Sequence, residues 1–328
     1  MPRPYSSVPP PVTLVTDAAG GWLPARLGEV EARLGDLAGG HGALLAEDAR
    51  ATLAAGGKRL RPLLVLLCAG PDSAATAVRA ATAIELVHMA TLVHDDVLDR
   101  APLRRGVPTV AAVSGAARAT ALGDLLFSRA FAELSQPGDE RRVRLLSEAS
   151  VGLALGELAQ RHDAFDAGID AERYLYRCRL KTARLFECAC LLGREPAEQD
   201  LEQALASFGE RIGLAFQLLD DVLDVAGPPE RTGKARGTDL IDGTVTLPLI
   251  LARQKDSELA SAELRGLDSE QAEDLCRRIA ASGALDEVRA IALEHVDEAK
   301  ALLEHPGFDA EERRLLALVA DGVVERYA

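Results

Sequence analysis

The chain has 328 residues and a formal net charge of −14, with 37 lysines and arginines against 51 aspartates and glutamates. This acidic balance argues against a nucleic-acid-binding protein, and an apolar content of 48% is too high for a disordered chain. Aromatic residues make up only 4%, which disfavours an all-β fold. The longest apolar run, Leu63 to Ala69, is far shorter than the roughly 20 residues of a membrane-spanning helix, so we expect no transmembrane segment.

The N-terminal residues 1–21 are rich in proline and lack the apolar core of a signal peptide, so we predict a flexible arm there. Residues 22–328 contain no Pro-, Gly- or Ser-rich linker and no charge block that would divide them, and we predict a single domain. The cysteine count is odd and shows no spacing typical of a disulfide framework. We therefore expect a reducing, cytoplasmic location.

Helix formers dominate the chain from residue 22 onward, chiefly Ala, Leu, Glu and Arg. Between breaks at Gly or Pro, apolar residues recur at helical spacing. In one segment Ile84, His88, Thr91 and Asp95 follow each other by four, three and four positions. The pattern predicts an all-α fold of roughly ten or more helices.

Two basic clusters interrupt this helical pattern. Segment 56–62 (GGKRLRP) concentrates three cations where the chain breaks before a helix, and loop 104–109 (RRGVPT) adds two more. Arginine binds phosphate with bidentate geometry, whereas lysine supplies a compact charge. Either cluster alone is typical of a solvated basic patch. Together they predict an anion site, because the second closely follows an acidic motif.

That acidic motif, Asp-Asp-x-x-Asp, occurs twice. The two copies are Asp95, Asp96 and Asp99, and Asp220, Asp221 and Asp224. In each copy the first and last aspartates lie on one helix face, because residues four apart are neighbours on a helix. Each copy follows a strongly apolar run, and a partly buried carboxylate cluster is costly unless cations neutralise it. A solvated helix face is the alternative for a single copy. Two copies favour helices facing across a cavity, with Mg²⁺ ions and a diphosphate between them.

In this order the motifs resemble the trans-isoprenyl diphosphate synthases, also called polyprenyl synthetases, and their medium- and long-chain members most. The resemblance extends from about Gly56 to Pro248. The motifs that carry it are GGKRLRP (56–62), ELVHMATLVHDDVLD (85–99), RRGVPT (104–109), Gly123-Asp124, GELAQ (156–160), LKTARLFE (180–187), FQLLDDVLD (216–224) and GKARGTDLIDGTVTLP (233–248). It implies an all-α orthogonal helical bundle of the isoprenoid synthase type around a deep central cavity, usually as a homodimer.

The resemblance also implies a Mg²⁺-dependent, head-to-tail prenyl transfer. An allylic diphosphate, here expected to be farnesyl or geranylgeranyl diphosphate, ionises and isopentenyl diphosphate attacks its C1 carbon. A proton then leaves, with the departing pyrophosphate as the expected acceptor, and the chain has grown by one C5 unit. Three Mg²⁺ ions are expected with substrate bound, and Mn²⁺ as a substitute.

Site residues follow from the same resemblance, motif by motif. All six aspartates of the two triads are expected to hold the metal. The residues expected to bind the allylic diphosphate are Arg104, Lys181 and Lys234. Those expected to bind isopentenyl diphosphate without metal are Lys58, Arg61, His88 and Arg105. Thr182 and Gln217 match polar residues near the developing carbocation, where preorganised dipoles assist ionisation.

Product length is expected to depend on the helix that carries the first triad. In short-chain relatives a bulky aromatic residue closes the tunnel four or five positions before the triad, and here these positions are the small Thr91 and Ala90. Met89 and Val87 are further candidates for narrowing the path. Two phenylalanines of a neighbouring helix, at positions 127 and 131, are candidates for a deeper floor. We therefore expect a product of C30 or longer, with geranylgeranyl diphosphate (C20) as the alternative.

Two other functions remain open. A class I terpene cyclase also uses an Asp-rich triad and Mg²⁺, but it needs no second diphosphate site, so segments 56–62 and 104–109 count against it. A non-catalytic subunit of a heteromeric prenyl synthase commonly loses Asp-rich motifs, and both are intact here.

Overall fold

The computed structural model describes residues 10–40, 43–54, 57, 59–104, 106–227 and 236–325, and it confirms the predicted all-α class. The only strands in these ranges are β1 (Leu103–Arg104) and β2 (Val107–Pro108), which pair as an antiparallel hairpin. The helices are α1 (Pro10–Ala19), α2 (Trp22–Gly39), α3 (Ala43–Ala54), α4 (Leu60–Ala69), α5 (Ala74–Leu98), α6 (Val110–Ser114), α7 (Ala116–Glu133), α8 (Glu140–His162), α9 (Ala171–Cys178), the π-helix η1 (Arg179–Ala183), α10 (Arg184–Gly193), α11 (Gln199–Ala226), α13 (Thr238–Ile241), α14 (Leu247–Arg253), α15 (Ser257–Ser261), α16 (Ser269–Ala281), α17 (Ala284–Leu302) and α18 (Ala310–Glu325).

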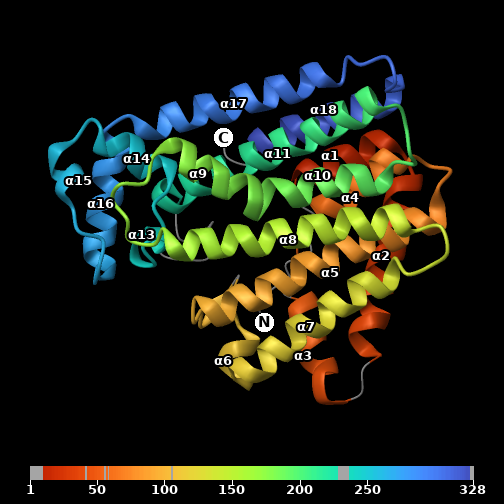
Figure 1. Cartoon of the computed structure of the whole chain (residues 1–328), viewed down its shortest axis with the longest axis horizontal. Helices are drawn as coiled ribbons and strands as arrows, with labels where there is room; N and C mark the ends of the chain where they lie inside the picture. Colours follow the sequence, from red (N-terminus) through yellow and green to blue (C-terminus); the bar gives the residue numbers. More distant parts are fainter. Residues whose placement is uncertain are drawn as a thin grey trace.

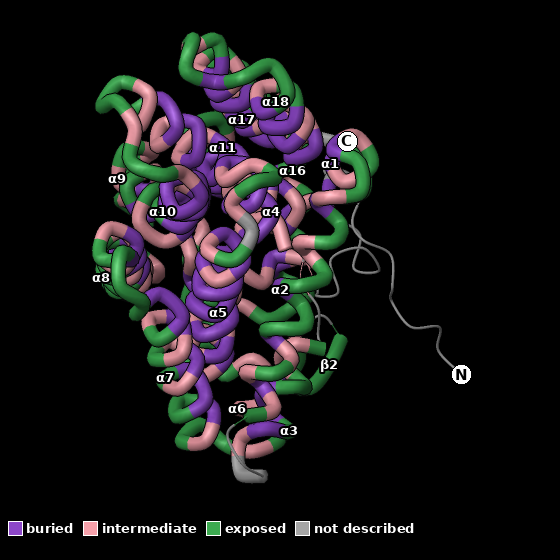
Figure 2. Tube along the Cα trace, turned by 90° about the vertical axis from the view of Figure 1, so that its right-hand side faces the viewer, coloured by how far each residue is buried: buried purple, intermediate pink, exposed green. Residues whose placement is uncertain are grey.

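The long helices α5, α8, α11 and α17 run along the longest dimension of the molecule, as Figure 1 shows. Helix α5 packs against α7, α4 and α2, while α11 packs against α17, α10 and η1. The short helices α13, α15 and α16 gather at one end (Figure 1). Buried residues concentrate on α4, α5, α10 and α11 (Figure 2). The two triad-bearing helices, α5 and α11, are thus elements of the core.

Helix α5 is both long and apolar. By length and composition its residues 75–98 are the one described stretch that passes as a membrane span. However, 72% of its apolar window is buried against the rest of the protein, as in the core helix of a globular domain. The first acidic triad lies at its C-terminal end, with Asp95 and Asp96 in the last turn and Asp99 directly after it.

The flexible arm predicted for residues 1–21 was wrong for Pro10–Ala19. These residues form α1, which packs against α18 and buries Val12 and Val15. The prolines do not prevent this, because proline is tolerated in the first helical turn, where the backbone N–H has no intrahelical partner. The remainder of the arm that precedes Pro10 lies outside the described residues, and the single-domain assignment stays a prediction.

The cysteine prediction was correct: all five cysteines are free and buried. They lie in helices α4, α9, α10 and α16. They therefore act as small apolar core residues.

Close helix approach shapes the region where α11 crosses α10. A Cβ atom added at Gly209 of α11 would lie 2.7 Å from the Cα of Glu187 and 2.8 Å from the carbonyl oxygen of Phe186. Both obstacles are backbone atoms of α10, so they cannot move aside as a flexible side chain would. Glycine at this position sets the spacing between the two helices.

We predict that Gly209→Ala lowers the free energy of unfolding by about 1–3 kcal/mol, since overpacking forces a backbone shift. Gly28→Ala is the matched control, because a Cβ on this exposed position of α2 would meet nothing within 4 Å among the described atoms. The control should be neutral or stabilising by up to about 1 kcal/mol. Urea denaturation followed by circular dichroism checks both, and equal stability of the two variants would contradict the packing argument.

Candidate functional site

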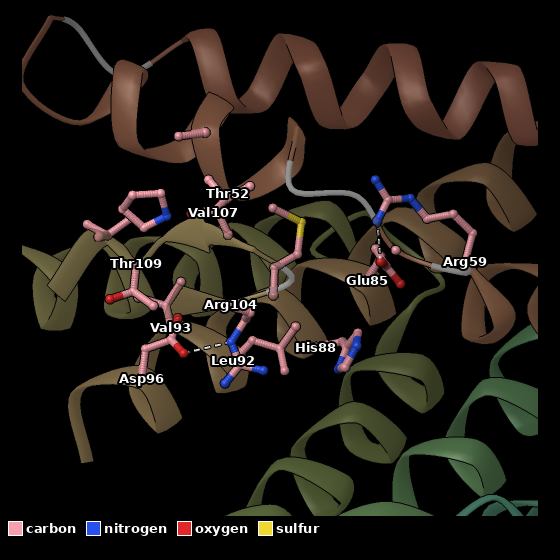
Figure 3. Close-up of a pocket in the computed structure, with 15 residues that line it drawn as sticks. Thr52, Arg59, Glu85, His88, Leu92, Val93, Asp96, Arg104, Val107 and Thr109 are labelled. Atoms are coloured by element: carbon pink, nitrogen blue, oxygen red, sulfur yellow. Dashed lines mark hydrogen bonds and ion pairs between the residues drawn. The ribbon is translucent and has the colours of Figure 1, made fainter. Parts of the chain in front are cut away.

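The first triad sits at the C-terminal end of α5, and its three carboxylates have different surroundings. Asp95 is half-buried, Asp96 is buried and Asp99 is exposed. The Nε atom of Arg104 donates a 2.6 Å hydrogen bond to Oδ1 of Asp96 (Figure 3). Asp99 instead forms an ion pair with Arg161 of α8. Asp95 and Asp96 therefore point to different sides of α5, as expected for adjacent helix positions.

Local turn chemistry places Arg104. Gly106 has a φ of 76° in the tight turn between β1 and β2, a conformation that glycine adopts without strain. After the hairpin, the Thr109 side chain caps α6 by accepting from the Ala112 amide at 3.1 Å. The same hydroxyl donates to the carbonyl of Ala101 at 2.6 Å. These contacts fold the loop back over the end of α5 and bring the guanidinium to Asp96.

Asp95 has several charged groups nearby. Burial raises its pKa to about 6, and the carboxylates of Glu157 and Asp99 act in the same direction. The cations Lys181 and Arg104 partly offset these effects. Lys181 is itself ion-paired with Glu157 of α8. Further positive charge beside Asp95 would therefore be stabilising.

Lys181 reaches this position from the π-helix η1, which lies between α9 and α10. Single π turns inside helices occur frequently at functional sites. On one side η1 packs against α8, where a Cβ at Gly156 would lie 2.6 Å from the backbone nitrogen of Lys181. On its other side it packs against α11. Glycine at position 156 allows the segment to approach α8 this closely.

The second triad lies on α11, with Asp220 half-buried and both Asp221 and Asp224 buried. Asp224 accepts a 3.2 Å hydrogen bond from the backbone N–H of Asp239, the second residue of α13. Burial raises the pKa of Asp221 well above its usual value, and the nearby charge of Asp239 adds to this. As for Asp95, the ionised form is disfavoured by its surroundings.

Asp221 belongs to a chain of hydrogen bonds. The hydroxyl of Tyr174 donates to its Oδ2 atom at 2.6 Å, and Nε2 of Gln217 donates to its Oδ1 atom at 2.7 Å. Oε1 of Gln217 in turn accepts from Oγ1 of Thr182 at 2.7 Å. Thr182 is the neighbour of Lys181 in η1, so two consecutive residues connect to the two triads.

No group of three or more His, Cys, Asp or Glu side chains in the described ranges is arranged as a ready-made metal site. The donor set nevertheless fits Mg²⁺, which prefers carboxylate oxygens and commonly uses one or two of them with waters and substrate phosphates. Burial raises the pKa values of Asp95 and Asp221, so their ionised forms carry a desolvation cost. A bound divalent cation would relieve that cost.

A pocket lies on the Asp96 side of α5, with about 580 Å³ of empty space, part of it open to solvent. His88, Arg104 and Asp96 line it together with residues of α3 and the hairpin (Figure 3). Arg59, also on its wall, is ion-paired with Glu85 at 2.7 Å. Arg59, the middle cation of segment 56–62, is therefore held by the protein itself through its ion pair with Glu85.

Arg61 differs from Arg59. Its guanidinium lies 4.6 Å from the ring centroid of Phe186, and its buried Nε atom has no hydrogen-bond partner among the described residues. Burial lowers its pKa to about 10, so it stays charged at neutral pH. A buried cation with an unused donor suits an anionic ligand. Three other predicted diphosphate ligands, Lys58, Arg105 and Lys234, lie outside the described residues.

The residues predicted to set product length do not share one face. Ala90, Val87 and Met89 are all buried, and the half-buried Thr91 donates its hydroxyl to the His88 carbonyl at 2.8 Å. Met89 lines the pocket on the Asp96 side. Thr91 lies one turn before Asp95 and so on that residue's side of the helix.

Phe127 of α7 is partly buried and stacks against His94, with ring centroids 5.9 Å apart. It therefore packs beside the end of α5 that carries the triad. Phe131, one turn further along α7, is also partly buried against the core.

Sequence reasoning missed several residues that the structure brings to the triads. They are Tyr174, Glu157, Arg161 and Asp239. Glu157 and Arg161 were detectable in principle, because they are four apart on a helix within and just after the GELAQ motif. Tyr174 gave no local signal, since its partner is 47 residues away.

Comparison with known proteins gives a consistent assignment. The family model described as "Polyprenyl synthetase" matches residues 43–281. Heptaprenyl diphosphate synthase component 2 of Geobacillus stearothermophilus is 37% identical over 79% of this chain and 83% of its own length. Geranylgeranyl diphosphate synthase of Methanosarcina mazei is 34% identical over 83% of this chain and 86% of its own. The crystal structure of a polyprenyl synthase from Caulobacter crescentus, complexed with calcium and isoprenyl diphosphate, has a TM-score of 0.88 and 34% identity, with 100% of both chains covered.

We predict that Asp95→Asn stabilises the metal-free protein at neutral pH. Because the pKa of Asp95 is raised to about 6 by burial, its ionised form costs stability at pH 7.5, by at most about 3 kcal/mol. The cost disappears below about pH 4, where the carboxyl is protonated in both folded and unfolded states.

Thermal unfolding in EDTA at pH 4 and pH 7.5 checks this. The variant should melt above the wild type at pH 7.5 and close to it at pH 4. Asp297→Asn, at an exposed position of α17, is the control and should follow the wild type at both values. A wild type with a higher melting temperature than Asp95→Asn at pH 7.5 would refute the electrostatic account of Asp95.

Proposed function

This chain belongs to the polyprenyl synthetase family, whose members are prenyl diphosphate synthases, and we propose that it condenses isopentenyl diphosphate with an allylic diphosphate, head to tail, to make a trans-polyprenyl diphosphate of C30 or longer. The observation that carries the proposal is the position of η1. Lys181 in this segment lies near the first triad, and Thr182 connects through Gln217 to the second. One diphosphate held at Lys181 would therefore lie within reach of both triads.

The proposal includes Mg²⁺, held by Asp95 and Asp99 on α5 and by Asp220 and Asp224 on α11. The middle aspartates accept from protein side chains, Asp96 from Arg104 and Asp221 from two residues, while Asp99 also pairs with Arg161 and Asp224 also accepts from the Asp239 amide. When bound, Mg²⁺ supplies Lewis-acid stabilisation of the negative charge that develops on the diphosphate leaving group.

The chain's own residues bind, orient and shield the substrates. Lys181 and Arg104 would bind the allylic diphosphate and balance the charge of the leaving group as its C1–O bond breaks. Arg61 and His88 would hold the diphosphate of isopentenyl diphosphate, whose double bond then attacks C1. A proton leaves the new chain for the departing pyrophosphate. The apolar residues around α5 exclude water, which would quench the cation to an alcohol.

The remaining diphosphate ligands of the proposal are Lys58, Arg105 and Lys234, assigned by family resemblance alone. Farnesyl and geranylgeranyl diphosphates are the proposed allylic substrates, and Mn²⁺ the proposed substitute metal. We further propose a cytoplasmic homodimer. Exposed Val151, Leu155 and Leu158 form an apolar stripe along α8, which supports association of two copies.

Two alternatives have specific support. A relative named geranylgeranyl diphosphate synthase favours a C20 product. A relative named "component 2" of a heptaprenyl diphosphate synthase favours a chain that needs a second, different subunit. Nothing in the structure favours a terpene cyclase.

We predict that the purified chain alone, with Mg²⁺ and farnesyl diphosphate, consumes isopentenyl diphosphate and releases pyrophosphate. Mass spectrometry of the products gives the chain length. Products that stop at C20 would replace the long-chain proposal with the first alternative. No consumption by the chain alone would overturn the proposal for the isolated protein, and a cyclic hydrocarbon from the allylic diphosphate alone would indicate a cyclase.

We predict that Ala90→Phe shortens the product by at least one C5 unit, because Ala90 is fully buried and a ring there would fill space beside the growing chain. Ala121→Phe, at an exposed position of α7, is the control and should leave the product distribution unchanged. An unchanged distribution in a folded Ala90→Phe variant would show that another surface limits chain growth.

A further inference from the structure

Tyr174, where the hydrogen-bond chain to Asp221, Gln217 and Thr182 begins, has no role in the mechanism described so far. Tyr174 is 2% exposed and lies on α9, next in sequence to η1. A buried tyrosine hydroxyl needs a hydrogen-bond partner, and this one has the carboxylate of Asp221 at 2.6 Å. The chain continues through Gln217 and ends at the hydroxyl of Thr182.

Each link in this chain has a fixed direction. Gln217 turns its NH₂ group towards Asp221, which is the orientation that the ionised form of Asp221 requires, because carboxylate oxygens can only accept. Its carbonyl oxygen is then left to face Thr182, and the Thr182 hydroxyl must donate its only proton to that oxygen. The hydroxyl oxygen keeps its lone pairs for whatever lies beside it.

The direction matters for the proposed reaction. A carbon atom that becomes positive is stabilised by oxygen lone pairs and destabilised by an O–H or N–H group pointing at it. If Gln217 were flipped, its NH₂ group would donate to Thr182, and the hydroxyl proton of Thr182 would be free to turn towards the substrate. The arrangement seen here excludes that state.

We propose that Tyr174 is a positioning residue which, through Asp221 and Gln217, holds the Thr182 hydroxyl with its lone pairs towards the reacting carbon. Asp221 is accordingly the central acceptor of this hydrogen-bond chain, since both of its oxygens accept from protein donors. The inference rests on the proposed function, and it names a residue that is far in sequence from the acidic motif it contacts.

A double-mutant cycle tests the proposal. Tyr174→Phe removes only the hydroxyl, and Thr182→Val removes the last hydroxyl of the chain with little change of shape. We expect Tyr174→Phe to lower kcat by about tenfold, the worth of one hydrogen bond to a charged group. The KM values for both diphosphates and the half-saturating Mg²⁺ concentration should stay within about twofold. In the Thr182→Val background, Tyr174→Phe should lower kcat little further, because the two residues act through one hydrogen-bond chain.

Tyr176→Phe is the matched control. Tyr176 lies on the same helix but is 45% exposed, and its ring, which is retained, is what contacts Arg173. It should leave kcat unchanged. Asp221→Asn is a second test if Tyr174→Phe lowers the melting temperature below the assay temperature. Asparagine offers only one acceptor oxygen, so it cannot accept from both Tyr174 and Gln217, and kcat should fall while the Mg²⁺ requirement stays the same.

The outcomes distinguish a failure of the proposed function from a failure of the positioning role of Tyr174. An inactive wild type would overturn the proposed function itself. With an active wild type, equal fold-losses from Tyr174→Phe in both backgrounds would show an independent, merely structural role and overturn the positioning proposal. An unchanged kcat in a folded Tyr174→Phe variant would do the same. A large rise in the Mg²⁺ requirement of Asp221→Asn would identify Asp221 as a metal ligand instead.

Discussion

The site depends on the position of the π-helix η1 between α8 and α11. Two consecutive side chains of this segment lie beside the two carboxylate triads. Lys181 lies near Asp95, while Thr182 is hydrogen-bonded to Gln217, which is hydrogen-bonded to Asp221. An added Cβ on Gly156 would collide with the Lys181 backbone, so the approach of η1 to α8 depends on glycine. In the proposed site, η1 together with the aspartates would connect the triads on two separate helices to one ligand.

Charge is balanced locally in this acidic protein. The net charge of −14 would repel diphosphates if it were spread evenly. Instead each carboxylate of the first triad has a cation nearby, Arg104 for Asp96, Arg161 for Asp99 and Lys181 for Asp95. Burial still disfavours the ionised form of Asp95. Additional positive charge beside Asp95 would therefore favour its ionised form, and a divalent cation would supply it.

The sequence predicted the all-α fold and both triads, because helical spacing and an i, i+4 motif are local patterns. Family resemblance led to Lys181, Thr182 and Gln217, which the structure connects to the triads. Local patterns misjudged the N-terminus, since α1 is stabilised by packing against α18, at the far end of the sequence. They also missed Tyr174, whose only distinctive property is a bond to a residue 47 positions away. The different partners of the three aspartates in a triad likewise depend on tertiary contacts.

The central claim is that the two triads and Lys181 form one diphosphate site. A crystal structure with pyrophosphate and Mn²⁺, with the metal located by its anomalous scattering, tests it most directly. The account predicts Mn²⁺ on Asp95 and Asp99 and on the α11 triad, one pyrophosphate bridging the two sets beside Lys181, and Tyr174 still bonded to Asp221. Metal confined to one triad, with pyrophosphate bound away from Lys181, would contradict it.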